Sequence, residues 1–151
     1  YLQNKITLRI YPNKYGSNDV DLFRHNFKNI KFDSNKNMYD SMNQNKLFIG
    51  TYNSTTFLEA LFMNYPTVMF WNQDQWELRN NAKEYFKILI NSKILHYEST
   101  SAANHVNDVW NNLYLWWYSH EIQNIRIRFC NQFAKSSKND NKKWINFYNS
   151  I

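Results

Sequence analysis

Glycine, proline and cysteine are all scarce in this chain. It contains 2 Gly and 2 Pro among 151 residues. So few turn-forming residues disfavour a turn-rich sandwich or barrel and a glycine-rich dinucleotide-binding fingerprint. The single cysteine, Cys130, excludes an intramolecular disulfide framework and a zinc site built from several cysteines. We therefore expect a reducing, cytoplasmic location.

Long hydrophobic runs are absent as well. The longest apolar stretch, 57–71, is interrupted by Glu59, Asn64 and Pro66, and is too short and too polar to span a bilayer. No signal peptide is visible, because the first residues lead directly into a strand-like run. Since the chain begins with Tyr1 and not with Met, we expect it to be a piece of a longer protein.

Aromatic and basic residues are plentiful. Hydrophobic residues make up 43% and aromatic residues 19% of the chain, which indicates a packed core and not a disordered segment. There are 18 Lys and Arg against 12 Asp and Glu, giving a net charge of +6. This excess suits an anionic ligand, an anionic membrane face or a nucleic acid, and does not choose among them.

Hydrophobic periodicity predicts a layer of strands and helices in the first half of the chain. In order, we expect a strand at 6–10, a helix beginning after Ser17 and Asn18, a short strand at 30–32, a helix capped by Ser34 whose Met38, Tyr39 and Met42 face inward, and a buried strand at 47–49 that ends at Gly50.

The pattern from 47 to 71 is the most regular. A helix at 55–64, with Phe57, Leu58, Leu61 and Phe62 on one face, lies between the strand at 47–49 and a third strand at 67–71. Strand, helix and strand within about 25 residues predict a parallel βαβ unit. Beyond Trp76 the pattern is helical almost to the end, with helices around 85–89, 106–117 and 122–133 and a short one at 144–148 after a polar break at 136–141. We expect a single α/β domain with a helical tail.

A cluster of hydroxyl side chains follows the strand at 47–49. Ser54, Thr55 and Thr56 lie where a strand leads into a helix, and a helix start in a parallel sheet is a natural phosphate site. Glu59, one turn later, has the chemistry to accept hydrogen bonds from ribose. The alternative is a capping box formed by Thr56 and Glu59, which needs no ligand. Spacing alone favours the cap, since such short matches are common.

Three larger side chains also follow strands. Arg9 ends the first strand and could approach the same anion, although a lone strand-end Arg is more often a solvated charge. Trp71 could stack on a ring and Arg79 could bind phosphate or carboxylate. The alternative for this second segment is a helix entry capped by Asn72 or Asp74 with packed indoles, and the sequence alone favours it slightly.

The sequence gives little support for a metal site or for a reactive cysteine. The four histidines show no metal-ligand spacing, and His105 with Asp108 lacks a third ligand. Cys130 fits a buried helix position. The aromatic run at 113–118 fits a helix that is half core and half neighbour contact. A basic C-terminal region fits a solvated face or, less often, a patch for anionic lipid or nucleic acid. That region comprises Arg126, Arg128, Lys135, Lys138, Lys142 and Lys143. We expect no metal and no cofactor.

Two segments carry a resemblance to a known family. Residues Tyr52–Leu61 and Asn64–Trp71 resemble the signature of transferases encoded in bacterial surface-polysaccharide gene clusters. The similarity covers nearly the whole chain, and the other matching segments follow in the same order: Trp76–Arg79, Ile94–His96, Ser101–Ala103, Trp116–Ser119 and Arg126–Cys130.

That family is similar to GT-B glycosyltransferases, which have two Rossmann-like domains with the active site between them. The resemblance implies a Rossmann-like parallel sheet flanked by helices, and a single nucleotide-sugar-binding domain over 1–151 with 100–151 as its helical tail. This chain would be the carboxy-terminal, donor-binding half. The amino-terminal domain, which supplies the catalytic base in many such enzymes, would be missing, so no catalytic residue is assigned.

The resemblance also implies roles for particular residues. Ser54, Thr55 and Thr56 become phosphate contacts and Glu59 the ribose acceptor, which reverses the preference for a helix cap. Arg9 matches a basic strand-end residue of related phosphotransferases, in which the strand often ends in His-Pro where this chain has Tyr11-Pro12. The full candidate substrate-binding set is Arg9, Asn53, Ser54, Thr55, Thr56, Glu59, Trp71 and Arg79.

The function expected from these observations is transfer from a nucleotide sugar to a glycan or lipid-linked acceptor in surface polysaccharide biosynthesis. The setting would be the cytoplasm, with peripheral contact at the inner face of the membrane. One alternative is a sugar-nucleotide epimerase of the same architecture. Another is a basic module that binds nucleic acid or an anionic membrane. Because no nucleic-acid-binding motif is present, nucleic acid is not an expected partner.

Overall fold

The computed structural model describes residues 2–11, 19–135, 145–146 and 148–149. The chain divides into two compact units, Tyr1–Lys46 and Leu47–Ile151. The predicted helix start at Ser17 and Asn18 lies outside the described residues. Of the predicted terminal helix at 144–148, the structure describes Ile145, Asn146 and Tyr148, and all three are helical. No helix within the described ranges is long and apolar enough to cross a membrane.

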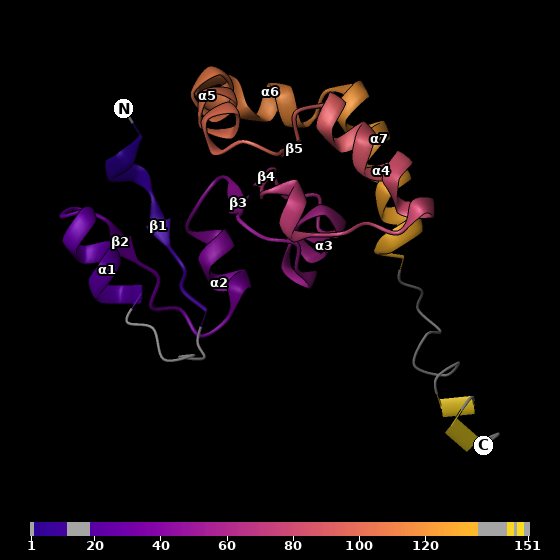
Figure 1. Cartoon of the computed structure of the whole chain (residues 1–151), viewed down its shortest axis with the longest axis horizontal. Helices are drawn as coiled ribbons and strands as arrows, with labels where there is room; N and C mark the ends of the chain where they lie inside the picture. Colours follow the sequence, from indigo (N-terminus) through magenta and orange to yellow (C-terminus); the bar gives the residue numbers. More distant parts are fainter. Residues whose placement is uncertain (1, 12–18, 136–144, 147, 150–151) are drawn as a thin grey trace. The chain divides into compact units, whose positions relative to one another are not determined.

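The first unit is a small α/β layer. Its two short strands are parallel, with Thr7 opposite Lys31 and Leu8 opposite Phe32 (Figure 1). The predicted strand at 6–10 is therefore confirmed only over its centre. The elements are η1 (Gln3–Lys5), β1 (Thr7–Leu8), α1 (Asp19–Asn26), β2 (Lys31–Phe32) and α2 (Met38–Asn43).

Two predictions for α2 are wrong. Ser34 does not cap this helix; Asn37 does, because it directly precedes the first helical residue and its side chain accepts from the backbone N–H of Asp40 at 2.9 Å. Tyr39 is 53% exposed and points outward. Met42 is buried as expected. A six-residue helix has a narrow buried face, and here one residue fills it.

The second unit is built on a three-stranded parallel sheet in the order β3-β4-β5. Helix α3 connects β3 to β4, which confirms the predicted βαβ unit and the Rossmann-like α/β class. The elements are β3 (Phe48–Gly50), α3 (Thr55–Phe62), β4 (Thr67–Phe70), η2 (Gln73–Gln75), α4 (Asn80–Asn91), β5 (Leu95–His96), α5 (Ser99–Val109), η3 (Trp110–Asn112), α6 (Leu113–Trp117) and α7 (His120–Phe133).

The sequence prediction missed β5 and one helix break. The chain after Trp76 is not continuously helical, because Leu95 and His96 pair in parallel with Met69 and Phe70. A strand of two buried residues is too short to show alternation. The predicted helix at 106–117 is divided by the turn η3.

Helices cover both faces of this sheet. Met69, Trp71 and Leu95 share one core with buried residues of α3, α4 and α7. Successive strand residues point to opposite faces, so His96 faces the other way, toward α5. Figure 1 shows α3 and α5 on opposite sides of the strands. The unit is therefore a three-layer α/β/α arrangement.

Two exposed residues correct the predicted core. Ile49 is 40% exposed on the edge strand β3, although the sequence predicts that this strand is buried. Phe62 is 52% exposed at the end of α3, while the smaller Ala60 is fully buried. The inward face of α3 is thus formed by Phe57, Ala60 and Leu61.

The last helix is part of this core. Phe129 and Cys130 of α7 are buried against the residues of α3 and α4. At the far end of α3, the Arg126 guanidinium donates to the carbonyl oxygen of Leu61 at 3.0 Å, which satisfies one of the free carbonyls at the helix end. The 120–133 part of the predicted tail is therefore packed onto the sheet layer.

Candidate functional site

The three parallel strands of the second unit end at one edge of the sheet, here called the carboxyl edge. Strand β3 ends at Gly50, β4 at Phe70 and β5 at His96, and each leads into a turn and then a helix. In open α/β sheets, ligands bind beyond the carboxyl ends of the strands. Most candidate residues lie in the segments that follow these ends.

Helix α3 begins at this edge with an incomplete cap. Ser54 is the N-cap residue, with extended backbone angles of φ −132° and ψ 172°, and its side chain makes no capping hydrogen bond. Because Thr56 is already inside the helix, it cannot form the capping box with Glu59. The first N–H groups of α3 are therefore left without the side-chain partner that a helix start commonly has.

The surrounding polar side chains are also uncommitted. Asn53, Ser54 and Thr56 are half-buried, and Thr55 and Glu59 are exposed. Among the described residues, none of these five side chains forms a hydrogen bond or an ion pair. Thr56 and Glu59 are three residues apart and so share one face of α3. The helix start thus presents hydroxyls, free N–H groups and one carboxylate together.

Trp71 occupies a different environment. Its side chain is 4% exposed and packs in the core, with ring centroids 5.7 Å from Phe57 and 6.3 Å from Phe86. Asn72 caps the following turn η2 by accepting from the Asp74 N–H at 2.9 Å. This arrangement matches the alternative in which Asn72 caps the following turn and the Trp71 indole packs in the core. Stacking on a ligand would require the indole to leave the core.

Arg79 lies on the surface just before α4. It is the N-cap residue of that helix, it is exposed, and its side chain makes no capping hydrogen bond. Its charge therefore remains available on the segment that links β4 to α4.

Arg9 belongs to the first unit and is held there by several groups. Its Nη1 donates to Asp33 Oδ2 at 2.7 Å, and its Nη2 donates to the carbonyl oxygen of Lys36 at 3.2 Å. Nη1 also lies within hydrogen-bond distance of the Asn35 carbonyl oxygen and Ser41 Oγ, at 2.9 and 3.3 Å. The parallel pairing of β1 with β2 makes this contact possible, because it brings the two strand ends, followed by Arg9 and Asp33, to one edge.

Asp33 is the buried centre of this group, with a side chain that is 2% exposed. Burial alone raises the pKa of its carboxyl group, but hydrogen bonds from the Ser41 hydroxyl and the Asn35 N–H, together with Arg9, lower it from 3.8 to about 2. Asp33 is therefore a buried carboxylate neutralised by Arg9.

A histidine pair lies at the end of β5. His96 Nε2 is 2.9 Å from the Lys93 carbonyl oxygen, and His96 Nδ1 is 2.8 Å from Ser101 Oγ. The ring of His105 lies 5.4 Å from the ring of His96, and its buried Nε2 has no partner. Burial, with the charges of His96 and Lys93, lowers the pKa of His105 to about 4. Both imidazoles are therefore neutral at pH 7.

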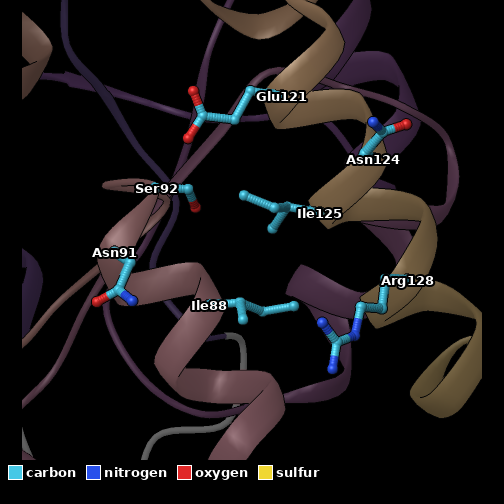
Figure 2. Close-up of a pocket in the computed structure, with 7 residues that line it drawn as sticks. All are labelled: Ile88, Asn91, Ser92, Glu121, Asn124, Ile125 and Arg128. Atoms are coloured by element: carbon cyan, nitrogen blue, oxygen red, sulfur yellow. The ribbon is translucent and has the colours of Figure 1, made fainter.

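A cavity of about 300 Å³ lies elsewhere, between α4 and α7 (Figure 2). Its α4 residues immediately precede β5, so it is at the edge opposite the carboxyl ends of the strands. Isoleucine side chains line its centre and polar groups its rim. The lining residues are Ile88, Asn91, Ser92, Glu121, Asn124, Ile125 and Arg128.

The comparison with known families decides the class of protein. The sequence model of the LIC12162 family transferases matches residues 1–147. The chain belongs to the LIC12162 transferase family. No curated protein and no solved structure gives a significant match to it. The resemblance to a transferase family is therefore confirmed at the level of the reaction class.

The structure of this LIC12162 family transferase shows which side chains lie close enough together to bind a metal ion. Among the described residues, no three His, Cys, Asp or Glu side chains lie close enough together to hold an ion. An Asp-x-Asp motif, which the expectation of no metal took to be absent, does occur in the sequence at Asp19 and Asp21, and carboxylates are ligands that divalent cations prefer.

Sequence reasoning about this LIC12162 family member also missed the His96, Ser101 and His105 group. These residues come together only because β5 brings His96 beside α5. The one signal in the sequence was the pair of segments Ile94–His96 and Ser101–Ala103 within the family resemblance.

Proposed function

We propose that this chain is the donor-binding half of a GT-B-like glycosyltransferase that acts in surface polysaccharide biosynthesis. The observation that supports it most is the start of α3. There the Ser54 side chain caps nothing, and the neighbouring Thr55 and Thr56 hydroxyls are uncommitted at the carboxyl edge of a parallel sheet. Family membership supports the coarser part of the proposal, a transferase.

The chemistry of a nucleoside diphosphate fits this helix start. Free N–H groups and the positive end of the helix dipole attract phosphate oxygens. The hydroxyls of Ser54, Thr55 and Thr56 add donors, and the Glu59 carboxylate, one turn along, accepts from ribose hydroxyls. Asn53 contributes an amide at the same turn.

In the proposed reaction, the sugar passes from the nucleotide to an acceptor hydroxyl, and negative charge develops on the departing diphosphate. The donors at the start of α3 are preorganised to stabilise that charge, which lowers the barrier. Arg79 adds an exposed cation from the β4–α4 segment. A role of Arg9 at this site stays a prediction from the resemblance, because Arg9 belongs to the first unit, where Asp33 holds its guanidinium.

The proposed partners follow from this reaction. They are a nucleotide-sugar donor, a glycan or lipid-linked acceptor, and an amino-terminal domain of the same protein that completes the cleft. The proposed setting is the inner face of the cytoplasmic membrane, where the basic residues of the carboxy-terminal region would contact anionic lipid.

Ligand-observed NMR with UDP, GDP, CDP, CMP and ADP tests the proposal. We expect selective binding that is lost in the double variant Ser54→Ala/Glu59→Ala. The matched control is Ser119→Ala, because Ser119 also begins a helix but its Oγ is used as a cap, accepting from the Ile122 N–H. Equal binding by the double variant and the native protein would overturn the site. No binding by a folded protein, joined to its amino-terminal domain, would overturn the function.

A further inference from the structure

The imidazole of His96 is fixed in one tautomer by its two hydrogen bonds. The Lys93 carbonyl oxygen can only accept, so His96 Nε2 carries the hydrogen and donates to it at 2.9 Å. His96 Nδ1 is then unprotonated and accepts from the Ser101 hydroxyl at 2.8 Å. Two hydrogen bonds therefore link a hydroxyl (Ser101), a base (His96) and a group that orients the base (the Lys93 carbonyl) in that order.

Burial differs sharply between the two members of this pair. His96 is 6% exposed, whereas Ser101 is exposed in the first turn of α5, at the carboxyl edge of the sheet. The first helical hydrogen bond of α5 runs from the Ala102 N–H to the Glu98 carbonyl oxygen at 3.1 Å. The earlier N–H groups therefore remain free beside Ser101. An accessible hydroxyl is backed by an inaccessible base.

The surroundings keep His96 neutral. Burial lowers the pKa of His96 below its ordinary value of 6.5, and the positive charge of Lys93 lowers it further, against the opposing hydrogen bond to the Lys93 carbonyl. His105, on α5, is neutral as well, because burial lowers its pKa to about 4 despite the opposing charge of Asp108. His96 Nδ1 is therefore free to accept a proton at neutral pH.

We propose that Ser101 and His96 form the proton acceptor for the hydroxyl of the acceptor substrate, a role that rests on the proposed transfer function. As the acceptor oxygen bonds to the transferred carbon, its proton passes to Ser101 Oγ and the Ser101 proton passes to His96 Nδ1. The bond from that carbon to the donor phosphate oxygen breaks, and its electron pair leaves with the phosphate.

The sheet topology brings the Ser101–His96 pair to the same edge of the sheet as the start of α3. Strands β3 and β5 lie on either side of β4, about two inter-strand spacings or roughly 10 Å apart. Helix α3 starts beyond β3 and α5 starts beyond β5, on the same carboxyl edge. Because α3 and α5 then run onto opposite faces of the sheet, donor phosphates at the first helix start and an acceptor hydroxyl at the second would lie on either side of the end of β4.

Covalent labelling with a fluorophosphonate tests whether Ser101 is activated. Ser101 Oγ attacks phosphorus, the P–F bond breaks with its electron pair on fluoride, and the hydroxyl proton goes to His96 Nδ1. We expect mass spectrometry of the digested protein to find the adduct on Ser101, formed about 100-fold faster than on Ser99 or Thr100, which share the same turn but have no imidazole partner.

Variants and pH complete the experiment. Ser101→Ala removes the adduct and Ser99→Ala leaves it; both positions are exposed, so both variants are expected to fold. Since His96→Gln could disturb the buried site, the pH dependence of labelling in the native protein provides a second measurement. The labelling rate is expected to fall as acid protonates His96, below its ordinary pKa of 6.5.

The outcomes separate this proposal from the donor site. Nucleotide binding without selective labelling of Ser101, or ¹⁵N NMR that places the hydrogen on His96 Nδ1, overturns the Ser101–His96 proposal alone. Labelling without nucleotide binding overturns the proposed function and the acceptor role with it. Nucleotide binding that persists in Ser101→Ala, together with selective labelling in the native protein, supports both.

Discussion

The guanidinium of Arg9 lies 2.7 Å from the buried carboxylate of Asp33, joining the carboxyl ends of the two parallel strands of the first unit. The Ser41 hydroxyl donates to the same carboxylate oxygen from α2. A side chain predicted to meet a phosphate is therefore also the partner that neutralises a buried charge. These two roles make different predictions.

Arg9→Ala is expected to destabilise the first unit by about 1–3 kcal/mol, because it leaves the Asp33 carboxylate without its cation. The measurement is hydrogen exchange at the Asp33 N–H, which donates to the Leu8 carbonyl oxygen at 2.9 Å. Lys28→Ala, at an exposed position of the same unit, serves as a control. Unchanged exchange in Arg9→Ala would contradict the structural role, and a specific loss of nucleotide affinity would assign Arg9 to the ligand.

The stability of the first unit is expected to fall in acid. The folded-state pKa of Asp33 is about 2, below its ordinary 3.8, so the folded state binds this proton more weakly than the unfolded state. The contribution of Asp33 is present above about pH 4 and is lost as the pH falls toward 2. Unfolding of the native protein and Asp33→Asn, compared across this range, measures it. Parallel pH profiles for the two proteins would refute the assignment.

Substitution of the N-cap serines Ser54 and Ser119 is expected to change the stability of the second unit by different amounts. Ser119→Ala removes a cap bond to the Ile122 N–H and should cost about 0.5–1 kcal/mol. Ser54→Ala removes no cap bond and should change the stability by less than about 0.5 kcal/mol. Urea unfolding of both variants measures the difference. A larger cost for Ser54→Ala would mean that Ser54 is a structural cap.

Trp71→Ala is expected to destabilise the second unit by about 3–5 kcal/mol, because the indole is 4% exposed against Phe57 and Phe86. Trp76→Ala, at a half-buried position after the same strand, should cost less. Urea unfolding followed by far-UV circular dichroism gives both values. A small loss of stability with a large loss of nucleotide affinity would instead indicate that Trp71 stacks on the ligand.

The sequence predicted the βαβ centre of the fold because its helix has a periodic apolar face and its strands are apolar runs with marked boundaries. Helix α3 and strand β4 carry clear patterns and a Pro66 boundary, and both lie close to their predicted positions. The pattern could not reveal β5, since two buried residues show no period. It also placed Phe62 inside, whereas Ala60 takes the buried position and Phe62 is exposed.

The site was predictable only where local sequence determines it. The hydroxyls of Ser54, Thr55 and Thr56 are adjacent in the chain, so their location at a helix start could be expected. The contacts of Arg9 with Asp33 and of His96 with His105 depend on strand pairing and helix packing. The absence of a Ser54 cap bond is likewise a matter of side-chain geometry, which spacing does not encode.

The central claim is that the start of α3 binds the diphosphate of a nucleotide. The most direct measurement is amide chemical-shift mapping in ¹⁵N spectra while the protein is titrated with the nucleotide that binds best. The account predicts the largest shifts at the N–H groups of residues 53–57, saturating together with the ligand signal. Shifts centred on the cavity between α4 and α7, or none in the folded protein, would contradict it.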